Sequence, residues 1–326
     1  MGGGQEGRSR EEGLNRSSAR LVRPSARALL SLVFAAVVAW NAAAATRATI
    51  VATTADLGSL AAAVAGPFAD IDVIVPPGLD AEAFEPKPAD IAKLRDAALI
   101  VRVGLGYDPW LDKLLRQIGD PRFARGGPAL VNASTGIPLL EVKGRAPTPD
   151  DGHAHGLANP HYWLDPANAE TITAAIAEGI ARVAPEHASA ASANRDRFLA
   201  ELRARIEGWR NQLAAYDGVP VVAYHNSWPY FARRFRINIV AVIEEKEGIA
   251  PSPTRLAKLV AQAKAAKVRI VIRETYEPED APRLVASRTG AVVATLASGV
   301  GAVPEAKDYI GLFDYNIAML LRALGG

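Results

Sequence analysis

The sequence contains no cysteine, and this absence removes several kinds of protein chemistry. Without thiols there is no disulfide framework, no thiolate metal site, no cysteine nucleophile and no cysteine to carry a lipid anchor. A basic run is also missing. The formal net charge is +2, but the first 45 residues hold six arginines against three glutamates, which leaves 31 basic and 32 acidic residues in the rest. Such a near-neutral chain gives no electrostatic reason to expect nucleic acid as a partner.

Long hydrophobic runs are equally scarce. The apolar run Ala28–Trp40 is shorter than the ~18 to 20 residues of a membrane-spanning helix. Arginines precede it and small residues follow it, which is the order of a secretory signal, with cleavage near Ala43–Ala45. A membrane anchor or a buried helix is the alternative, and the lack of a second apolar segment disfavours both. We therefore expect residues 1–45 to be a signal peptide with an N-terminal extension.

The rest of the chain alternates short β-branched runs with alanine-rich stretches, a pattern typical of parallel sheets covered by helices. The predicted strands fall into two groups, one before residue 104 and one after residue 220. They are Thr49–Thr53, Ile71–Val75 and Leu99–Val103 in the first group, and Val221–His225, Ile237–Ile243, Val268–Arg273 and Ala291–Leu296 in the second.

A stretch without strand signals, residues 165–216, separates the two groups. Pro185 divides it into two predicted helices, and Asp165 followed by Pro166 is a typical helix start. In the second helix, apolar residues spaced by four, four, three and four positions form one stripe, namely Phe198, Leu202, Ile206, Trp209 and Leu213.

The sequence therefore predicts an α/β protein of two lobes, each a small parallel sheet covered by helices, joined by one long rigid helix. The expected boundaries are 46–185 for the N-terminal lobe, 186–216 for the connecting helix and 217–326 for the C-terminal lobe. A helical connector absorbs little change in backbone angles, so we expect little domain closure. Residues 141–157 are rich in proline, glycine and aspartate, which predicts a mobile loop.

Metal-capable side chains follow several predicted strands. In open parallel sheets, ligands bind at the carboxyl ends of the strands. His225 and Glu274 end two strands, Glu82 and Glu85 lie in the turn-rich loop after Ile71–Val75, and His161 precedes the first long helix.

Each of these residues also has an ordinary structural role open to it. His161 could pack beside its aromatic neighbours, His225 could be a hydrogen-bonded core residue, Glu82 and Glu85 could be solvated, and Glu274 could cap a turn. The convergence of separate segments on one edge of the sheets favours a metal site. Nitrogen and oxygen donors suit zinc, and carboxylates also suit manganese or ferrous iron.

From about Ile50 onward the chain resembles the zinc and manganese solute-binding proteins of ABC metal importers. The resemblance is carried, in order, by Pro77–Ile91, Asn159–Pro166, His225–Ala232 and Pro251–Pro253. It implies two α/β lobes joined by one long helix, which agrees with the pattern above. It also implies a periplasmic protein that binds a metal ion as cargo and docks on an ABC permease. We expect a monomer without enzymatic activity or lipid anchor.

The resemblance also implies a ligand set. The family usually has a histidine where Glu82 stands, while His161 matches the second ligand and His225 the third, in its zinc-type form. The fourth ligand, usually an aspartate, falls at about Ala297, which cannot bind metal, so we expect Glu274 to take its part. The expected ligands are therefore Glu82, His161, His225 and Glu274, with Zn2+ favoured and Mn2+ or Fe2+ as alternatives.

His153 and His155 resemble, in reduced form, the histidine-rich loop of zinc-type members, which implies an auxiliary metal-catching role. The alternative is that the two histidines are incidental residues of a linker.

Three other functions compete with metal capture for import. A secreted metallohydrolase could use Glu85 or Glu247 to activate water, but the chain has no HExxH spacing and no nucleophile elbow. A binder of iron chelates or corrinoids would need a wider pocket. A family member with changed cargo is the third.

Overall fold

The computed structural model describes residues 1, 47–142, 157–244 and 249–325. The chain divides into two units, Met1–Thr46 and Arg47–Gly326, and the description below concerns the second. The predicted signal segment, His153, His155, most of the 141–157 loop and Glu247 lie outside the described residues. Within the described ranges, no helix has both the length and the apolar character required to cross a bilayer.

The first sheet contains four parallel strands in the order β2-β1-β3-β4. They are β1 (Ala48–Ala52), β2 (Ala69–Val73), β3 (Leu99–Arg102) and β4 (Leu130–Asn132). The predictions for the first three strands are confirmed. The strand β4 was not predicted, because a three-residue edge strand is too short to produce a recognisable apolar run.

The second sheet repeats this arrangement with the parallel order β6-β5-β7-β8. Its strands are β5 (Pro220–Ala223), β6 (Asn238–Val242), β7 (Ile270–Glu274) and β8 (Val292–Leu296), and all four were predicted. In both sheets the strand that comes first in the chain pairs with neighbours on both sides. The carboxyl ends of β1 and β5 therefore lie near the centre of each sheet edge.

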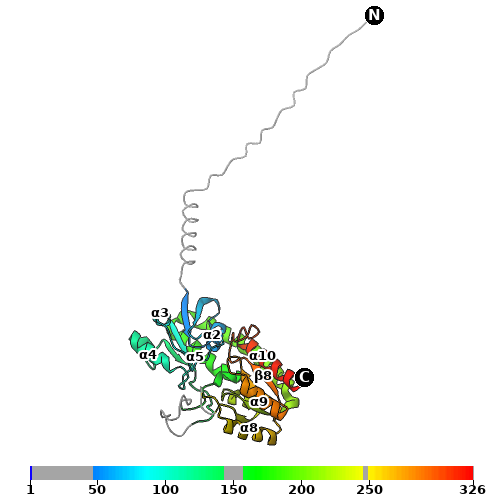
Figure 1. Cartoon of the computed structure of the whole chain (residues 1–326). Helices are drawn as coiled ribbons and strands as arrows, with labels where there is room; N and C mark the ends of the chain where they lie inside the picture. Colours follow the sequence, from blue (N-terminus) through cyan, green and yellow to red (C-terminus); the bar gives the residue numbers. More distant parts are fainter. Residues whose placement is uncertain (2–46, 143–156, 245–248, 326) are drawn as a thin grey trace. The chain divides into compact units, whose positions relative to one another are not determined.

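Helices cover both faces of each sheet, and Figure 1 colours the first sheet from blue to cyan-green and the second from yellow-green to orange. The α-helices are α2 (Ala55–Ala65), α3 (Pro88–Asp96), α4 (Pro109–Ile118), α5 (Ala169–Val183), α6 (Ala188–Leu213), α7 (Pro229–Phe235), α8 (Pro253–Ala265), α9 (Asp280–Thr289) and α10 (Tyr309–Leu324). Single 3-10 turns occupy Gly66–Phe68, Pro121–Phe123, Tyr162–Leu164, Pro166–Asn168, Pro185–His187 and Ala214–Tyr216.

The core follows from the alternation of side chains along each strand. On the first sheet Ile50 and Ala52 face a central apolar core, whereas Val51 faces a separate cluster under α3 and α4. On the second sheet Val222 packs beneath α8 and α9, and its neighbour Val221 joins the central core. The central core thus contains buried side chains of both sheets.

The long helix α6 contacts α2 and α5 of the first half of the molecule (residues 47–185) and α10 of the second half (residues 217–325). Its start at Ala188, directly after the 3-10 turn at Pro185–His187, confirms the predicted break. Leu202, Trp209 and Leu213 of the predicted stripe are buried. The indole Nε1 of Trp209 donates to Asp314 on α10 at 2.8 Å, so the helix is tied to the second half by a hydrogen bond as well as by packing.

Asp165 holds the start of α5 against α7. Its Oδ1 accepts a hydrogen bond from Ala167 N at 3.0 Å, which confirms the predicted capping role, although a 3-10 turn precedes the α-helix. Both carboxylate oxygens also accept from Arg234, at 2.6 Å and 3.0 Å. The Asp165 side chain is fully buried, whereas that of Arg234 is partly exposed. Arg233 adds a further contact to Oδ2 at 3.4 Å, so two arginines balance the charge of this carboxylate.

Replacing Asp165 by Ala is expected to lower the free energy of unfolding by about 3 kcal/mol, because the buried carboxylate that pairs with Arg234 and the cap of the turn are lost together. Urea denaturation measures the change. The control is Asp217→Ala, which breaks an exposed ion pair with Arg236 and should cost less than about 1 kcal/mol. Equal losses of stability in the two variants would contradict the proposed contribution of Asp165 to folding.

Candidate metal centre

The four candidate ligands lie at the carboxyl edges of the two sheets. Glu82 belongs to the loop between β2 and α3, and His161 directly precedes the 3-10 turn Tyr162–Leu164. His225 follows β5 by two residues, and Glu274 is the last residue of β7. His161, His225 and Glu274 expose 8% of their surface or less, and the side chain of Glu82 exposes 11%.

Three of these side chains meet at one point. The Nε2 atoms of His161 and His225 each lie 3.7 Å from Oε2 of Glu82. One potential ligand atom from each residue lies within 4.8 Å of the other two. Tetrahedral zinc, at about 2.0 to 2.1 Å from each ligand, separates its ligand atoms by roughly 3.3 Å. The cluster is therefore close to the dimensions of a single-ion site before any adjustment.

The other nitrogen of each imidazole fixes the orientation of its ring. Nδ1 of His225 lies 2.7 Å from Oε2 of Glu244, and Nδ1 of His161 lies 3.2 Å from Oδ1 of Asn159. A carboxylate or carbonyl oxygen on Nδ1 favours the tautomer with the proton there and directs Nε2 toward a metal. Asn159 is itself held, because its Nδ2 donates to the carbonyl of Asn226 at 2.8 Å.

The loop that carries Glu82 is ordered by its own side chains. Oδ1 of Asp80 accepts hydrogen bonds from Glu82 N at 2.9 Å and from Ala83 N at 3.4 Å, which closes an Asx turn. Trp110 on α4 donates its indole N–H to the carbonyl of Ala81 at 3.4 Å. The carboxylate of Glu82 is thus positioned by the backbone geometry on both sides of it. Glu85, three residues later, is exposed and outside the cluster.

Glu274 lies beside the three-residue cluster rather than within it. It lines a cavity of about 40 Å³ together with His161, Asp56 and Tyr276. Its Oε1 atom is buried and accepts no hydrogen bond among the described residues. Burial raises the pKa of Glu274, against the hydroxyl of Ser227 and the charge of His225, which lower it. A cation in or near this cavity would satisfy a carboxylate that is otherwise costly to bury.

The negative charges around His225 govern its protonation. Burial by itself lowers the pKa of His225. The hydrogen bond to Glu244 and the charges of Glu82 and Glu274 outweigh burial and raise the pKa from 6.5 to about 10. In the metal-free protein His225 is therefore protonated at neutral pH, and a metal ion at Nε2 must displace that proton.

Two site residues were missed in the sequence. Glu244 follows β6 by two residues, so the strand-end rule that identified His225 and Glu274 also covers it. Asp56 lies in the first turn of α2, where an acidic residue is ordinarily explained by the helix dipole. Ala297, the expected position of the family's aspartate, is fully buried, and its N–H donates to Asn316 at 2.8 Å.

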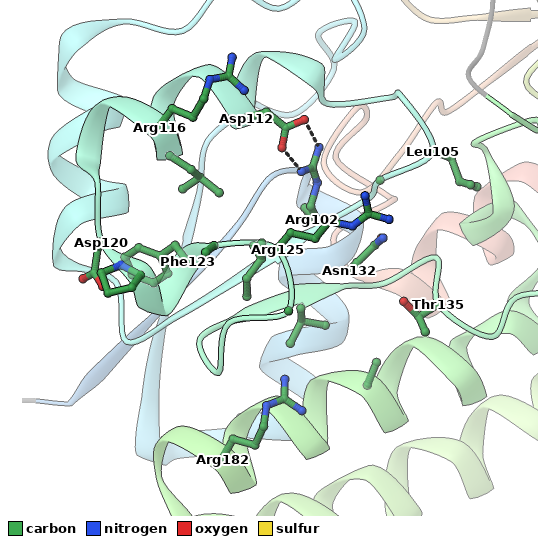
Figure 2. A pocket seen from close by; sticks show the side chains of 18 of the residues that line it. Arg102, Leu105, Asp112, Arg116, Asp120, Phe123, Arg125, Asn132, Thr135 and Arg182 are labelled. Carbon is green, nitrogen blue, oxygen red and sulfur yellow. Dashed lines mark hydrogen bonds and ion pairs between the residues drawn. The ribbon is translucent and has the colours of Figure 1, made fainter. Parts of the chain in front are cut away.

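A groove of about 1010 Å³ on the first half has a different lining (Figure 2). Arginines line it, among them Arg102, Arg116 and Arg182, and Arg102 is paired with Asp108 at 2.9 Å and with Asp112. The groove contains none of the candidate ligands. Asp112, Asp120 and Glu178 also line the groove, but no histidine does, so it lacks the imidazole and carboxylate combination of the sheet edges.

Two parallel α/β sheets with imidazoles and carboxylates gathered at their carboxyl edges define a class of metal-binding α/β protein. The chain belongs to the family described as "Zinc-uptake complex component A periplasmic", whose profile matches residues 50–323. The family resemblance inferred from the sequence is therefore confirmed, and so is the predicted α/β architecture of two small parallel sheets and one long helix.

Individual relatives agree with this membership. A putative metal-binding protein of Treponema pallidum is 30% identical over 84% of this chain and 86% of its own length. The high-affinity zinc uptake system protein ZnuA of Yersinia pestis is 26% identical, over 81% and 87% respectively. A crystal structure of ZnuA superimposes with a TM-score of 0.71 at 26% identity and covers 85% of this chain and 99% of its own.

The proton on His225 leads to a pH-dependent prediction. Zinc binding at pH 7 should release about one proton from His225, and the affinity should rise with pH toward the pKa of that group. Glu244→Gln removes the charged hydrogen-bond partner, lowers the pKa of His225 and should reduce the proton release. Calorimetry in buffers of different ionisation enthalpy measures it. Glu201→Gln, on the exposed side of α6, is the control. Equal proton release in all three proteins would contradict this account.

Proposed function

We propose that this protein captures a divalent transition metal in the periplasm, with zinc favoured, and delivers it to the permease of an ABC importer. The observation that carries the proposal is the convergence of two imidazole Nε2 atoms on one carboxylate oxygen of Glu82, each at 3.7 Å, in a nearly buried position. Family membership and the zinc uptake relative support the same role.

The proposed ligands are Glu82, His161, His225 and Glu274. The first three are already gathered, and Glu274 borders the adjoining cavity that His161 also lines. A small shift of the Glu274 side chain, or of the ion toward the cavity, completes a set of two nitrogens and two oxygens. This set suits four-coordinate zinc. Bidentate carboxylates would also accommodate Mn2+ or Fe2+ at higher coordination, and the usual affinity order favours zinc.

We propose a binding function without catalysis. A hydrolytic metal site keeps an open coordination position and a nearby base for the attacking water. Four protein ligands fill the coordination sphere, and the exposed Glu85 lies outside the cluster. The aromatic rings of Tyr107 and Trp163 pack against His161, with centroids at 5.4 Å and 5.3 Å, which further limits access by substrate.

The protein is proposed to be exported by a cleaved signal peptide and to act as a free periplasmic monomer. The residues 1–45 carry the signal pattern, and the family description also names the periplasm. Since the sequence contains no cysteine, a thioether-linked lipid has no attachment point.

The metal site itself is tested by calorimetric titration of metal-stripped protein. The wild type is expected to bind one zinc ion. His161→Ala and His225→Ala should each weaken binding at least about 100-fold, more than the ~10- to 100-fold cost of losing an outer partner. Glu274→Ala should weaken it about 10-fold, because a fourth ligand is lost. His187→Ala is the control, since His187 is partly exposed and stacks on Phe68, away from the cluster.

Two results would count against the proposal at different levels. Absence of zinc, manganese and iron binding in the wild type would end the metal-capture function. Unchanged zinc affinity in Glu274→Ala would remove only that residue from the ligand set and leave the three-residue cluster in place.

His153 and His155 are proposed as auxiliary residues that catch metal and pass it to the buried cluster, because imidazoles on a polar loop bind metal transiently. Deletion of Asp150–His155 should slow zinc loading about 10-fold in stopped-flow measurements at low zinc, while the equilibrium affinity stays that of the wild type. A deletion of Arg145–Asp150 is the control for shortening. Identical loading rates in all three proteins would show that the histidine pair is incidental.

A further inference from the structure

Asp56 is a buried acid that the four-ligand set does not use. It lies in the first turn of α2, exposes 5% of its surface, and lines the same cavity of about 40 Å³ as His161 and Glu274. The helix α2 follows β1, so Asp56 reaches the cavity from the first sheet, whereas Glu274 reaches it from the second. The cavity is therefore bordered by a carboxylate from each half.

No basic side chain forms an ion pair with Asp56 within the described part of the chain. Its Oδ1 accepts one hydrogen bond from the backbone N–H of Val300, at 3.0 Å. Burial raises the pKa of Asp56 to about 7, against the Val300 and Asp56 backbone N–H groups, which lower it. A cation in the cavity would offset the cost of burying the charge of this carboxylate.

The loop after β8 passes close to the Asp56 carboxylate. A Cβ atom on Gly299 would lie 2.6 Å from Oδ2 and 3.1 Å from Oδ1 of Asp56, so any larger residue at position 299 would have to displace the carboxylate. The hydrogen bond from Val300 N–H holds Oδ1 from the same loop. The carboxylate is therefore held at the cavity by contacts within the protein.

The cavity offers room and polar partners for an ordered water. A volume of about 40 Å³ exceeds that of a single water molecule. Its walls include Thr54, Tyr276 and Ser298, and the buried Oε1 of Glu274 at its edge accepts no hydrogen bond from the described residues. An unsatisfied carboxylate oxygen and a second buried carboxylate facing one small cavity indicate a place for a hydrated cation.

We propose that Asp56 is a further cation-binding and selectivity-determining residue, which contacts the metal ion at Glu82, His161 and His225 through a water molecule in this cavity. The proposal rests on the metal-capture function proposed above. A third carboxylate adds negative charge and one more oxygen contact. The added charge and the added oxygen contact both favour ions such as Mn2+, which prefer oxygen ligands and higher coordination numbers. Zn2+ gains less, because four protein ligands already complete its coordination.

Asp56→Asn tests this directly, because the amide oxygen still accepts the Val300 N–H while the charge is lost. We expect the affinity for Mn2+ to fall about 10-fold and that for Zn2+ about 3-fold or less, so the zinc-to-manganese ratio rises. Competition titrations with both metals measure the ratio. Asp70→Asn is the matched control, since Asp70 is an exposed acid on β2 paired with Arg47.

Unchanged affinities for both metals in folded Asp56→Asn would overturn the inference and leave Asp56 as a contact between α2 and the loop after β8. Circular dichroism and thermal unfolding of the metal-free protein establish folding. If the amide variant does not fold, Asp56→Ser, which keeps an oxygen acceptor without charge, is judged by the same criterion. A wild type that binds no metal at all contradicts the proposed function instead, so the two failures are distinguishable.

Discussion

The burial of residues 158–165 is the constraint on which the site depends. This segment passes between the two halves, and each of its side chains is buried. Tyr162 donates its hydroxyl to the carbonyl of Val103 in the first half, at 2.8 Å, and Tyr230 of the second half donates to the carbonyl of Asn159 at 3.0 Å. The residues on both sides of His161 are thus held by partners from both halves, which fixes the backbone that carries the imidazole.

The strands and the long helix could be predicted because their patterns are local. Runs such as Leu99–Val103 combine β-branched residues with full burial, and the stripe containing Leu202 and Trp209 has the helical period. Strand ends then indicated His225 and Glu274, since parallel sheets bring such ends to one edge. The general location of the site follows from these two rules alone.

The detailed geometry could not be obtained in this way. Whether Glu274 lies inside the close cluster or beside it depends on contacts between residues far apart in the sequence, and spacing carries no information about them. The same holds for Asp56, which meets Val300 across the molecule. The strand-end rule could have identified Glu244 as a candidate. Its role as the hydrogen-bond partner of His225 depends on the orientation of the His225 ring, which only the folded chain defines.

Tyr309, at the start of α10, has a consequence for biogenesis. Its hydroxyl donates to the carbonyl of Trp163, two residues from His161, and its N–H donates to Ser59 on α2 at 2.9 Å. Every proposed ligand precedes this tyrosine in the chain. Under the proposed export, the ligand-bearing segments would emerge before the contact that fixes the His161 segment. The His161 segment therefore gains this contact only after α10 has docked.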